Sequence, residues 1–126
     1  MKLNSYQIAE IIHSVSSRIP RPDGSLVPVW CDLPDEHKQH AINAVEKIMS
    51  SQSRTPEELH NLWMEPLIKN GWTQGEHSFE LKQHPCLVPF DELPESEILK
   101  DELWYHLTEC FRKYYTQNEE EASELF

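Results

Sequence analysis

Glycine and positive charge are both scarce in this sequence. Its 126 residues include only three glycines, and none of them belongs to a P-loop or a G-x-G-x-x-G turn, so a phosphate cradle built from glycine backbone is excluded. Lys and Arg total 11 against 22 Asp and Glu, which gives a formal net charge of -11 at pH 7. Nucleic acids and anionic membranes both bind cationic surfaces, so we expect neither as a partner.

Paired cysteines and long apolar runs are absent as well. Cys31, Cys86 and Cys110 are odd in number and form no C-x-x-C motif, which favours a reduced protein over a disulfide framework. No apolar run approaches the roughly 20 residues that cross a bilayer. Glu10 and His13 interrupt the apolar residues near the N-terminus, so that segment does not read as a signal peptide. We therefore expect a cytoplasmic protein with no membrane partner.

What the sequence does contain is helical periodicity. Apolar residues recur at intervals of three and four in four segments, and the helices expected from them cover residues 5–18, 35–49, 56–70 and 94–115. The clearest start is Thr55, because it is followed by Pro56 and by a glutamate three residues on, which together form a capping box with proline in the first turn. Gly71 predicts the end of the same helix, whereas Pro66 predicts a kink or a displaced last turn.

The helical period is lost between Trp72 and Phe90. We expect an irregular excursion with a short β-hairpin there, so the fold class is mainly α (α+β), with four helices and the excursion between the third and last helices. The length suits one domain, which we place at residues 1–116. Residues 117–126 are acidic, and we expect them to form a flexible tail that ends in two apolar residues suited to docking on a partner, Leu125 and Phe126.

Seven histidines suggest a metal or acid–base site, but their spacing argues against one. His37 and His40 lie three apart without an H-E-x-x-H pattern, on the helix face that we expect to be exposed. Carboxylates such as Asp91 and Glu92 precede a helix, where acidic side chains favour the helix dipole. The sequence has no nucleophile elbow. We therefore expect no metal, no cofactor and no enzymatic activity, and an enzyme acting on a nucleotide is the least favoured alternative.

Histidine and aromatic residues gather in the middle of the sequence. His60 and Trp63 are three residues apart, so both lie on the same side of the third expected helix. Trp72 follows that helix directly, and His84 and Phe90 close the excursion. Two interpretations are open. The rings pack in the core, or they form an aromatic shelf on which a planar ligand stacks while His60 donates a hydrogen bond.

The same residues belong to a series of motifs in a characteristic order. The series is Trp30–Pro34, H-x-x-W at His60, G-W-x-x-G at Gly71, H-P-x-L-V-P-F-x-x-L at His84, and Lys100-Asp101. With its motifs in this order the sequence resembles the RyR domain, the repeat of ryanodine receptors, which also occurs as a single copy in bacterial and phage proteins. The resemblance covers about residues 5–112.

This resemblance implies a mainly helical module with a short β segment and a ligand-binding role. In the receptors, tandem repeats form a paired cleft that is implicated in adenine-nucleotide binding. Carried over to this sequence, Trp63 would stack on a base, His60 would contact a polar group or phosphate, and Asp101 would accept from ribose hydroxyls or an exocyclic amine. Trp72 and His84 complete the predicted site. The predicted function is non-enzymatic binding of a nucleotide or nucleotide-derived small molecule, for sensing or sequestration.

Further expectations concern the charge of the ligand, the oligomeric state and an alternative function. Pro66 and Leu67 stand where a basic residue would help to hold phosphate, so we expect a nucleotide derivative of low charge rather than a triphosphate. A single copy of a paired repeat implies a twofold homodimer, with the two Trp63 rings facing each other across the axis. The alternative function is a protein–protein interaction module, in which Trp63, Trp72 and the last helix bury a partner surface.

Overall fold

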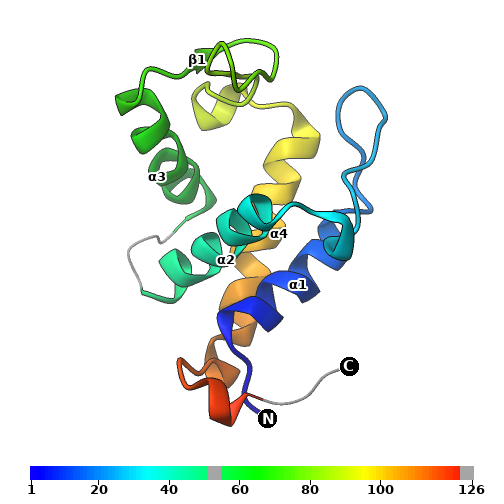
Figure 1. Ribbon diagram of the computed structural model, residues 1–126, viewed down its shortest axis with the longest axis vertical. Helices are drawn as coiled ribbons and strands as arrows, with labels where there is room; N and C mark the ends of the chain where they lie inside the picture. Colours follow the sequence, from blue (N-terminus) through cyan, green and yellow to red (C-terminus); the bar gives the residue numbers. More distant parts are fainter. Residues whose placement is uncertain (51–54, 123–126) are drawn as a thin grey trace.

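Four α-helices form the framework of the part of the molecule that the structure describes. The computed structural model describes residues 1–50 and 55–122, whose arrangement is shown in Figure 1. The helices are α1 (Ser5–Ser16), α2 (Asp35–Met49), α3 (Pro56–Lys69) and α4 (Glu95–Phe111). The strands β1 (Thr73–Gln74) and β2 (Gln83–His84) lie between α3 and α4 in the chain. The described 3-10 turns are Trp30–Asp32, Phe90–Glu92, Arg112–Tyr114 and Glu119–Glu121. The prediction of a mainly α fold with a short β segment is confirmed.

Side-chain caps explain where α1 and α3 begin. Asn4 Oδ1 accepts a hydrogen bond from the Gln7 amide at 2.8 Å, and the Asn4 amide donates to Gln7 Oε1 at 3.0 Å, which completes a capping box. Thr55 Oγ1 accepts from the Glu58 amide at 3.1 Å, and Pro56 occupies the first turn of α3. These contacts satisfy amides that the helix itself leaves unpaired, so both helix starts follow from local sequence.

The ends of α3 and α4 lie close to their predicted positions. Gly71 follows α3 with a φ of 87°, a left-handed conformation that glycine adopts without steric cost. Pro66 does not end α3, which continues to Lys69. α4 ends at Phe111, where the chain tightens into the 3-10 turn Arg112–Tyr114. Among the helices of the described residues, none combines the length and apolar character that crossing a bilayer requires.

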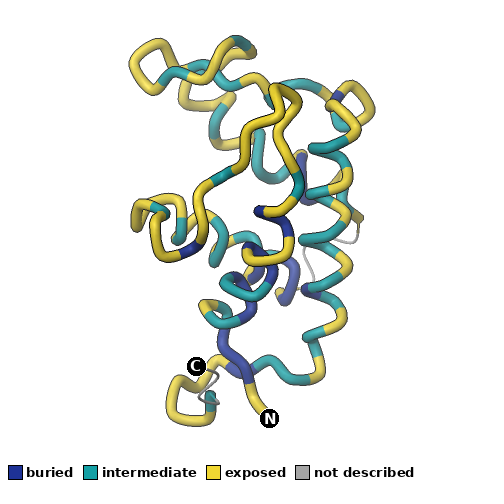
Figure 2. The backbone as a smooth tube through the Cα atoms, turned by 90° about the vertical axis from the view of Figure 1, so that its right-hand side faces the viewer, coloured by how far each residue is buried: buried dark blue, intermediate teal, exposed yellow. Residues whose placement is uncertain are grey.

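The hydrophobic core lies where α1 packs against α2 and α4. Its buried members come from the N-terminal segment, α1, the turn before α2, and α2 itself: Leu3, Ile8, Ala9, Ile12, Trp30, Val45 and Met49. Figure 2 shows the buried backbone concentrated at the centre and in the lower half of the view, whereas the loops at the top are exposed. The core therefore organises one end of the molecule and leaves most of α3 outside it.

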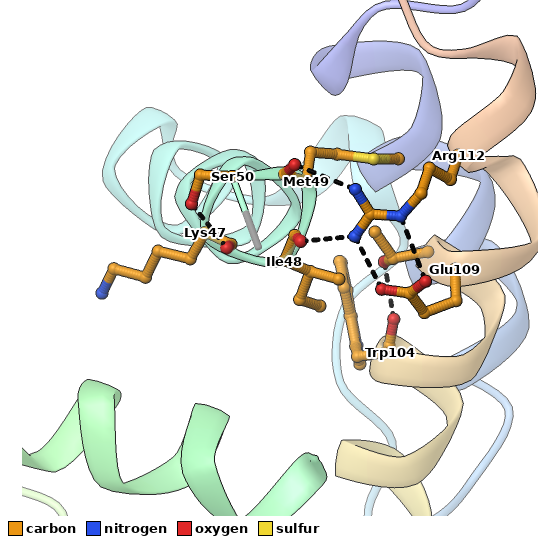
Figure 3. A network of polar contacts seen from close by, with 8 residues as sticks. Lys47, Ile48, Met49, Ser50, Trp104, Glu109 and Arg112 are labelled. Carbon is orange, nitrogen blue, oxygen red and sulfur yellow. Dashed lines mark hydrogen bonds and ion pairs between the residues drawn. The ribbon is translucent and has the colours of Figure 1, made fainter. Parts of the chain in front are cut away.

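Arg112 connects the end of α4 to the end of α2 through hydrogen bonds (Figure 3). Its guanidinium donates to the Ile48 carbonyl at 2.7 Å and to the Met49 carbonyl at 3.0 Å. The same group holds both carboxylate oxygens of Glu109, at 2.7 and 3.1 Å, which lowers the pKa of Glu109. Helices leave their last carbonyls unpaired, so Arg112 supplies the donors that α2 lacks.

The two ends of the described chain lie side by side. The Leu3 amide donates to the Tyr114 carbonyl at 2.7 Å, and the Thr116 amide donates to the Leu3 carbonyl at 2.8 Å, in a parallel bridge between Leu3 and Tyr115. Beyond this bridge, Glu119 accepts from Asn4 Nδ2 at 2.7 Å. The predicted docking residues at 125–126 lie outside the described residues, and the domain boundary at residue 116 stays a prediction.

The excursion between α3 and α4 contains a pair of strands that run parallel. Thr73 pairs with Gln83 and Gln74 pairs with His84, so the two strands do not form the predicted hairpin. Parallel pairing requires the chain to loop back between them, and Lys82 adopts a positive φ of 53° within that loop. A Cβ on Gly75 would lie 2.7 Å from the Gln83 side-chain oxygen, so a larger residue at this position would displace the Gln83 side chain.

Candidate functional site

A cavity of about 520 Å³ opens between α2, α3 and α4. Its volume falls in the usual range of small-molecule sites, about 300–1,000 Å³. Four of the five predicted site residues line it: His60 and Trp63 from α3, His84 from β2 and Asp101 from α4. The structure therefore brings together residues that lie far apart in the sequence.

His60 is held in place from both sides of its ring. Its side chain is nearly buried, and Nε2 lies 2.8 Å from the Val88 carbonyl oxygen. A carbonyl only accepts, so we assign the Nε2 proton to this bond. Nδ1 lies 3.8 Å from Asp101 Oδ2. His60 is therefore positioned to orient its neighbours, and its Nε2 proton is committed to the backbone rather than to a ligand.

Trp63 packs between two histidines and is half-buried in the cavity wall. Its ring stacks on His60 with centroids 5.5 Å apart and an interplanar angle of 29°. The His84 ring meets Trp63 edge-on at 4.9 Å and 74°. Aromatic pairs of these two geometries are both favourable, so the two imidazoles fix the orientation of the indole at the cavity wall.

His84 is held as a neutral imidazole. Burial, together with the nearby His77 and His60, lowers its pKa from 6.5 to about 4. Its Nδ1 accepts a hydrogen bond from the Cys86 amide at 3.0 Å. In the neutral ring the proton then lies on Nε2, so His84 can offer one hydrogen-bond donor.

Asp101 carries an unusually basic carboxyl group. Burial is the main cause that raises its pKa from 3.8, Glu97 adds to the rise and Lys100 opposes it, and the resulting pKa is about 7. Its side chain keeps 33% of its exposure, and Glu97 is paired with Lys100 at 3.4 Å. Near neutral pH Asp101 is therefore present in both protonation states, and it can accept a hydrogen bond or donate one.

Cys86 lines the same cavity but is not an activated nucleophile. Burial, together with the nearby Glu97 and Asp101, raises the pKa of its thiol from 9.0 to about 11. Thiolates are the reactive form of cysteine, and they are favoured by positive rather than negative surroundings. The Cys86 thiol is therefore protonated at neutral pH and contributes apolar surface to the wall.

Trp72 is the predicted site residue that the structure places elsewhere. It is not among the residues that line the cavity, and its ring meets Phe79 edge-on at 5.8 Å and 88°. Trp72 therefore packs within the excursion. The G-W-x-x-G motif that drew attention to it marks the end of α3 and the close approach at Gly75.

The lining residues that were not foreseen as part of the site include Lys47, Glu97 and Trp104. Glu97 and Trp104 share a face of α4 with Asp101, at intervals of four and three, and this spacing was a signal available in the sequence. Lys47 comes from α2, and its place in the cavity depends on how α2 packs against α3. Sequence periodicity indicates which residues share a face, but not what that face meets.

A second cavity, of about 400 Å³, lies near the chain ends and contains none of the predicted residues. Its carboxylates have partners. Ser5 Oγ donates to Glu46 at 3.0 Å, and Asn4 Nδ2 donates to Glu119 at 2.7 Å. In the part of the chain that the structure describes, no three His, Cys, Asp or Glu side chains are grouped so as to hold a metal ion.

Comparison with known families agrees with the order of the motifs. A model of the RyR domain matches residues 32–116, which is more than half of the chain. The matched range contains α2, α3, both strands and α4, and therefore every residue that lines the larger cavity. The chain belongs to the RyR domain family.

Proposed function

We propose that this RyR domain is a non-enzymatic module that binds a nucleotide or a nucleotide-derived small molecule. The observation that carries the proposal is the cavity of about 520 Å³ in which Trp63, His84 and Asp101 converge. Small-molecule sites combine apolar and aromatic walls with a few well-placed polar groups, and this cavity has both. Its walls also include Leu59, Leu67 and other apolar side chains.

The chemistry of the walls suits a heteroaromatic base. Trp63 offers a flat apolar surface whose orientation is fixed by His60 and His84. Bases stack on aromatic side chains with little dependence on sequence, because every base has a π face. Nε2 of His84 supplies a donor, and the Asp101 carboxyl supplies an acceptor or a donor. A planar ring with mixed donors and acceptors along its edge matches this set.

Two observations support binding without catalysis. The Cys86 thiol is held protonated by burial and by the neighbouring carboxylates. His60, the buried histidine of the site, has its Nε2 proton committed to the Val88 carbonyl.

We also propose a reducing cytoplasmic compartment, because Cys31, Cys86 and Cys110 are free thiols.

A thermal-shift screen against nucleosides, nucleotides, dinucleotides and cyclic nucleotides tests this function. A ligand at 100 times its dissociation constant adds about 2.7 kcal/mol of stability and raises the melting temperature by several degrees. We expect the shift to vanish in Trp63→Ala and to persist in Trp72→Ala, because the second indole lies outside the cavity. A screen without any shift, or equal ligand shifts in wild type and Trp63→Ala, would overturn the proposal.

The exposed apolar side chains of the excursion favour a second candidate, a protein-interaction module. Phe79 is 57% exposed and Leu81 is 69% exposed. Large apolar residues grouped on a surface mark interaction sites more often than isolated ones do. A pull-down that captures one defined partner, and that fails with Phe79→Ser and Leu81→Ser together, would support this candidate. Retention of the partner by the double variant would exclude it.

Homodimerisation remains a separate proposal. The helices that line the cavity all belong to one chain, so ligand binding as proposed here does not require a second copy. Light scattering on a size-exclusion column measures the mass directly. A mass of two chains that falls to one in a Trp63 variant would support the facing arrangement, and a mass of one chain at high concentration would exclude it.

A further inference from the structure

Lys47 is a cation placed in the wall of an otherwise acidic cavity. It lies in the last turn of α2, on the same face as His40 and Ala44, and all three line the cavity. Figure 3 shows its side chain extending away from α4 and from the Arg112–Glu109 network. The Lys47 ammonium therefore lies on the side of α2 that faces the cavity.

The Lys47 ammonium has no counter-ion in residues 1–50 and 55–122, since no carboxylate there lies within 4.0 Å of it. The other lysines near α3 and α4 are engaged. Lys100 pairs with Glu97 at 3.4 Å, and Lys69 pairs with Glu65 at 3.1 Å. Among the lining residues that the structure describes, Lys47 is the single Lys or Arg. An unpaired ammonium in a partly enclosed site is free to bind an anion.

The acidic groups of the cavity come from a different helix. Glu97 and Asp101 line the cavity from α4, whereas Lys47 lines it from α2. Trp63 lines the cavity from α3. The cavity is therefore polarised, because an anionic group is favoured beside α2 and repelled beside α4. A ligand with one anionic end and one neutral, hydrogen-bonding end fits this distribution of charge.

We propose that Lys47 binds the phosphate of a ligand that carries a single phosphate group, with the base stacked on Trp63. His40 and Asn43 line the cavity from the same helix and supply further hydrogen-bond donors beside Lys47. One ammonium balances much of the charge of one phosphate monoester. A triphosphate brings further negative charge toward Glu97 and Asp101, and the described lining residues include no second Lys or Arg to balance it. The proposal rests on the proposed function and specifies its ligand as a nucleoside monophosphate.

Isothermal titration calorimetry with matched ligands tests the assignment. The probes are adenosine, AMP and ATP, and guanosine, GMP and GTP, at constant pH and ionic strength without divalent cations. For at least one base, we expect the monophosphate to bind about 10-fold more tightly than its nucleoside, since a hydrogen bond to a charged group contributes this much. We expect the triphosphate to bind more weakly than the monophosphate.

Variants of Lys47 separate the phosphate contact from the base contact. Lys47→Gln is expected to lower monophosphate affinity to the level of the nucleoside and to leave nucleoside affinity unchanged. Lys47→Arg is expected to retain the preference. The matched control is Lys69→Gln, which removes a lysine of α3 that does not line the cavity, and it is expected to behave as wild type.

The outcomes distinguish the two proposals. Equal affinity for nucleoside and monophosphate in wild type would overturn the role of Lys47 and leave the nucleotide-binding function standing. The role of Lys47 would also be overturned if Lys47→Gln still bound the monophosphate more tightly than the nucleoside, or if Lys69→Gln abolished this preference. Tightest binding of the triphosphate would overturn the single-phosphate specificity. If neither nucleosides nor nucleotides bind, both proposals are wrong.

Discussion

The two ends of the molecule are held together in different ways. At the α1 end, Ile8, Ile12, Val45 and Ile48 are completely buried. At the α3 end, buried side chains in the described part of the chain are few, and ring contacts around Trp63 replace aliphatic packing. A filled core gives stability, whereas a binding site needs surface that the chain itself leaves uncovered. The comparison indicates that one end maintains the fold and the other is available for a ligand.

The largest expected effect tests this division directly. Ile12→Ala should cost about 3 kcal/mol of unfolding free energy, because a fully buried side chain leaves a cavity in close-packed surroundings. Leu59→Ala should cost about 1 to 2 kcal/mol, because Leu59 borders a cavity that is already open. Urea denaturation measures both. Equal costs would mean that the α3 end is packed as firmly as the α1 end.

The second-largest expected loss of stability concerns Arg112, which lies at the α1 end of the molecule. Arg112→Ala should cost about 2 kcal/mol, because the carbonyls of Ile48 and Met49 lose a charged donor. Arg112→Lys should recover only part of this, because an ammonium lacks the planar fork that reaches both carbonyls and Glu109. Chemical denaturation of the two variants provides the test. A cost below 0.5 kcal/mol for Arg112→Ala would show that α2 and α4 are held together by apolar packing alone.

Asp101→Asn tests how much folding stability is lost when the carboxyl group of Asp101 ionises in the cavity. The folded protein raises the pKa of Asp101 to about 7, so folding is disfavoured once this carboxyl ionises. The penalty is small near pH 4, grows as pH rises toward 7, and is constant above that. Asn carries no charge, so the variant should be more stable than wild type above pH 7, by about 1 kcal/mol after allowance for solvent screening. Thermal melts at pH 4, 6 and 8 measure the trend.

The control for this prediction is the pH profile of the variant. His84 has its pKa lowered to about 4, so the unfolded chain binds a proton more readily and stability falls as pH drops from 6.5 toward 4. In wild type the Asp101 and His84 effects oppose each other across this range. Asp101→Asn leaves only the histidine effect, so its stability should rise with pH between 4 and 6.5. An unchanged pH profile would contradict the raised pKa of Asp101.

The smallest effect concerns the start of α3. Thr55→Ala removes the oxygen that accepts from the Glu58 amide and should cost about 0.5 to 1 kcal/mol. Amide hydrogen exchange should accelerate in the first turn of α3 and remain unchanged in α1. Faster exchange in both helices would show that the two ends open together, and the comparison would fail.

Local sequence predicted the helices because their signals act over a few residues. Asn4, Thr55 and Gly71 lie at helix boundaries and make caps or turns that depend only on near neighbours. The direction of the two strands could not be predicted in this way. It depends on the path of the loop from residue 75 to residue 82 and on the close contact of Gly75 with Gln83.

The candidate site also contains features that the sequence predicted and features that it did not. The motif order drew attention to His60, Trp63, His84 and Asp101, and the structure brings these four together. Their binding of a ligand stays a prediction. Trp72 lies outside the cavity because its ring packs against Phe79 within the excursion, whereas Lys47 lies inside it because of how α2 packs against α3. The spacing of residues along the sequence indicates neither arrangement.

The bridge between Leu3 and Tyr115 also determines how this domain can be joined to other polypeptides. Chain attached before residue 3 and after residue 116 leaves from neighbouring points at the bottom of the molecule, whereas α3 and the excursion lie at the top (Figure 1). Domains with adjacent termini tolerate insertion into surface loops of host proteins. Placed between the two halves of a split fluorescent reporter, this domain would need only short connectors, and neither connector would cross the α3 end.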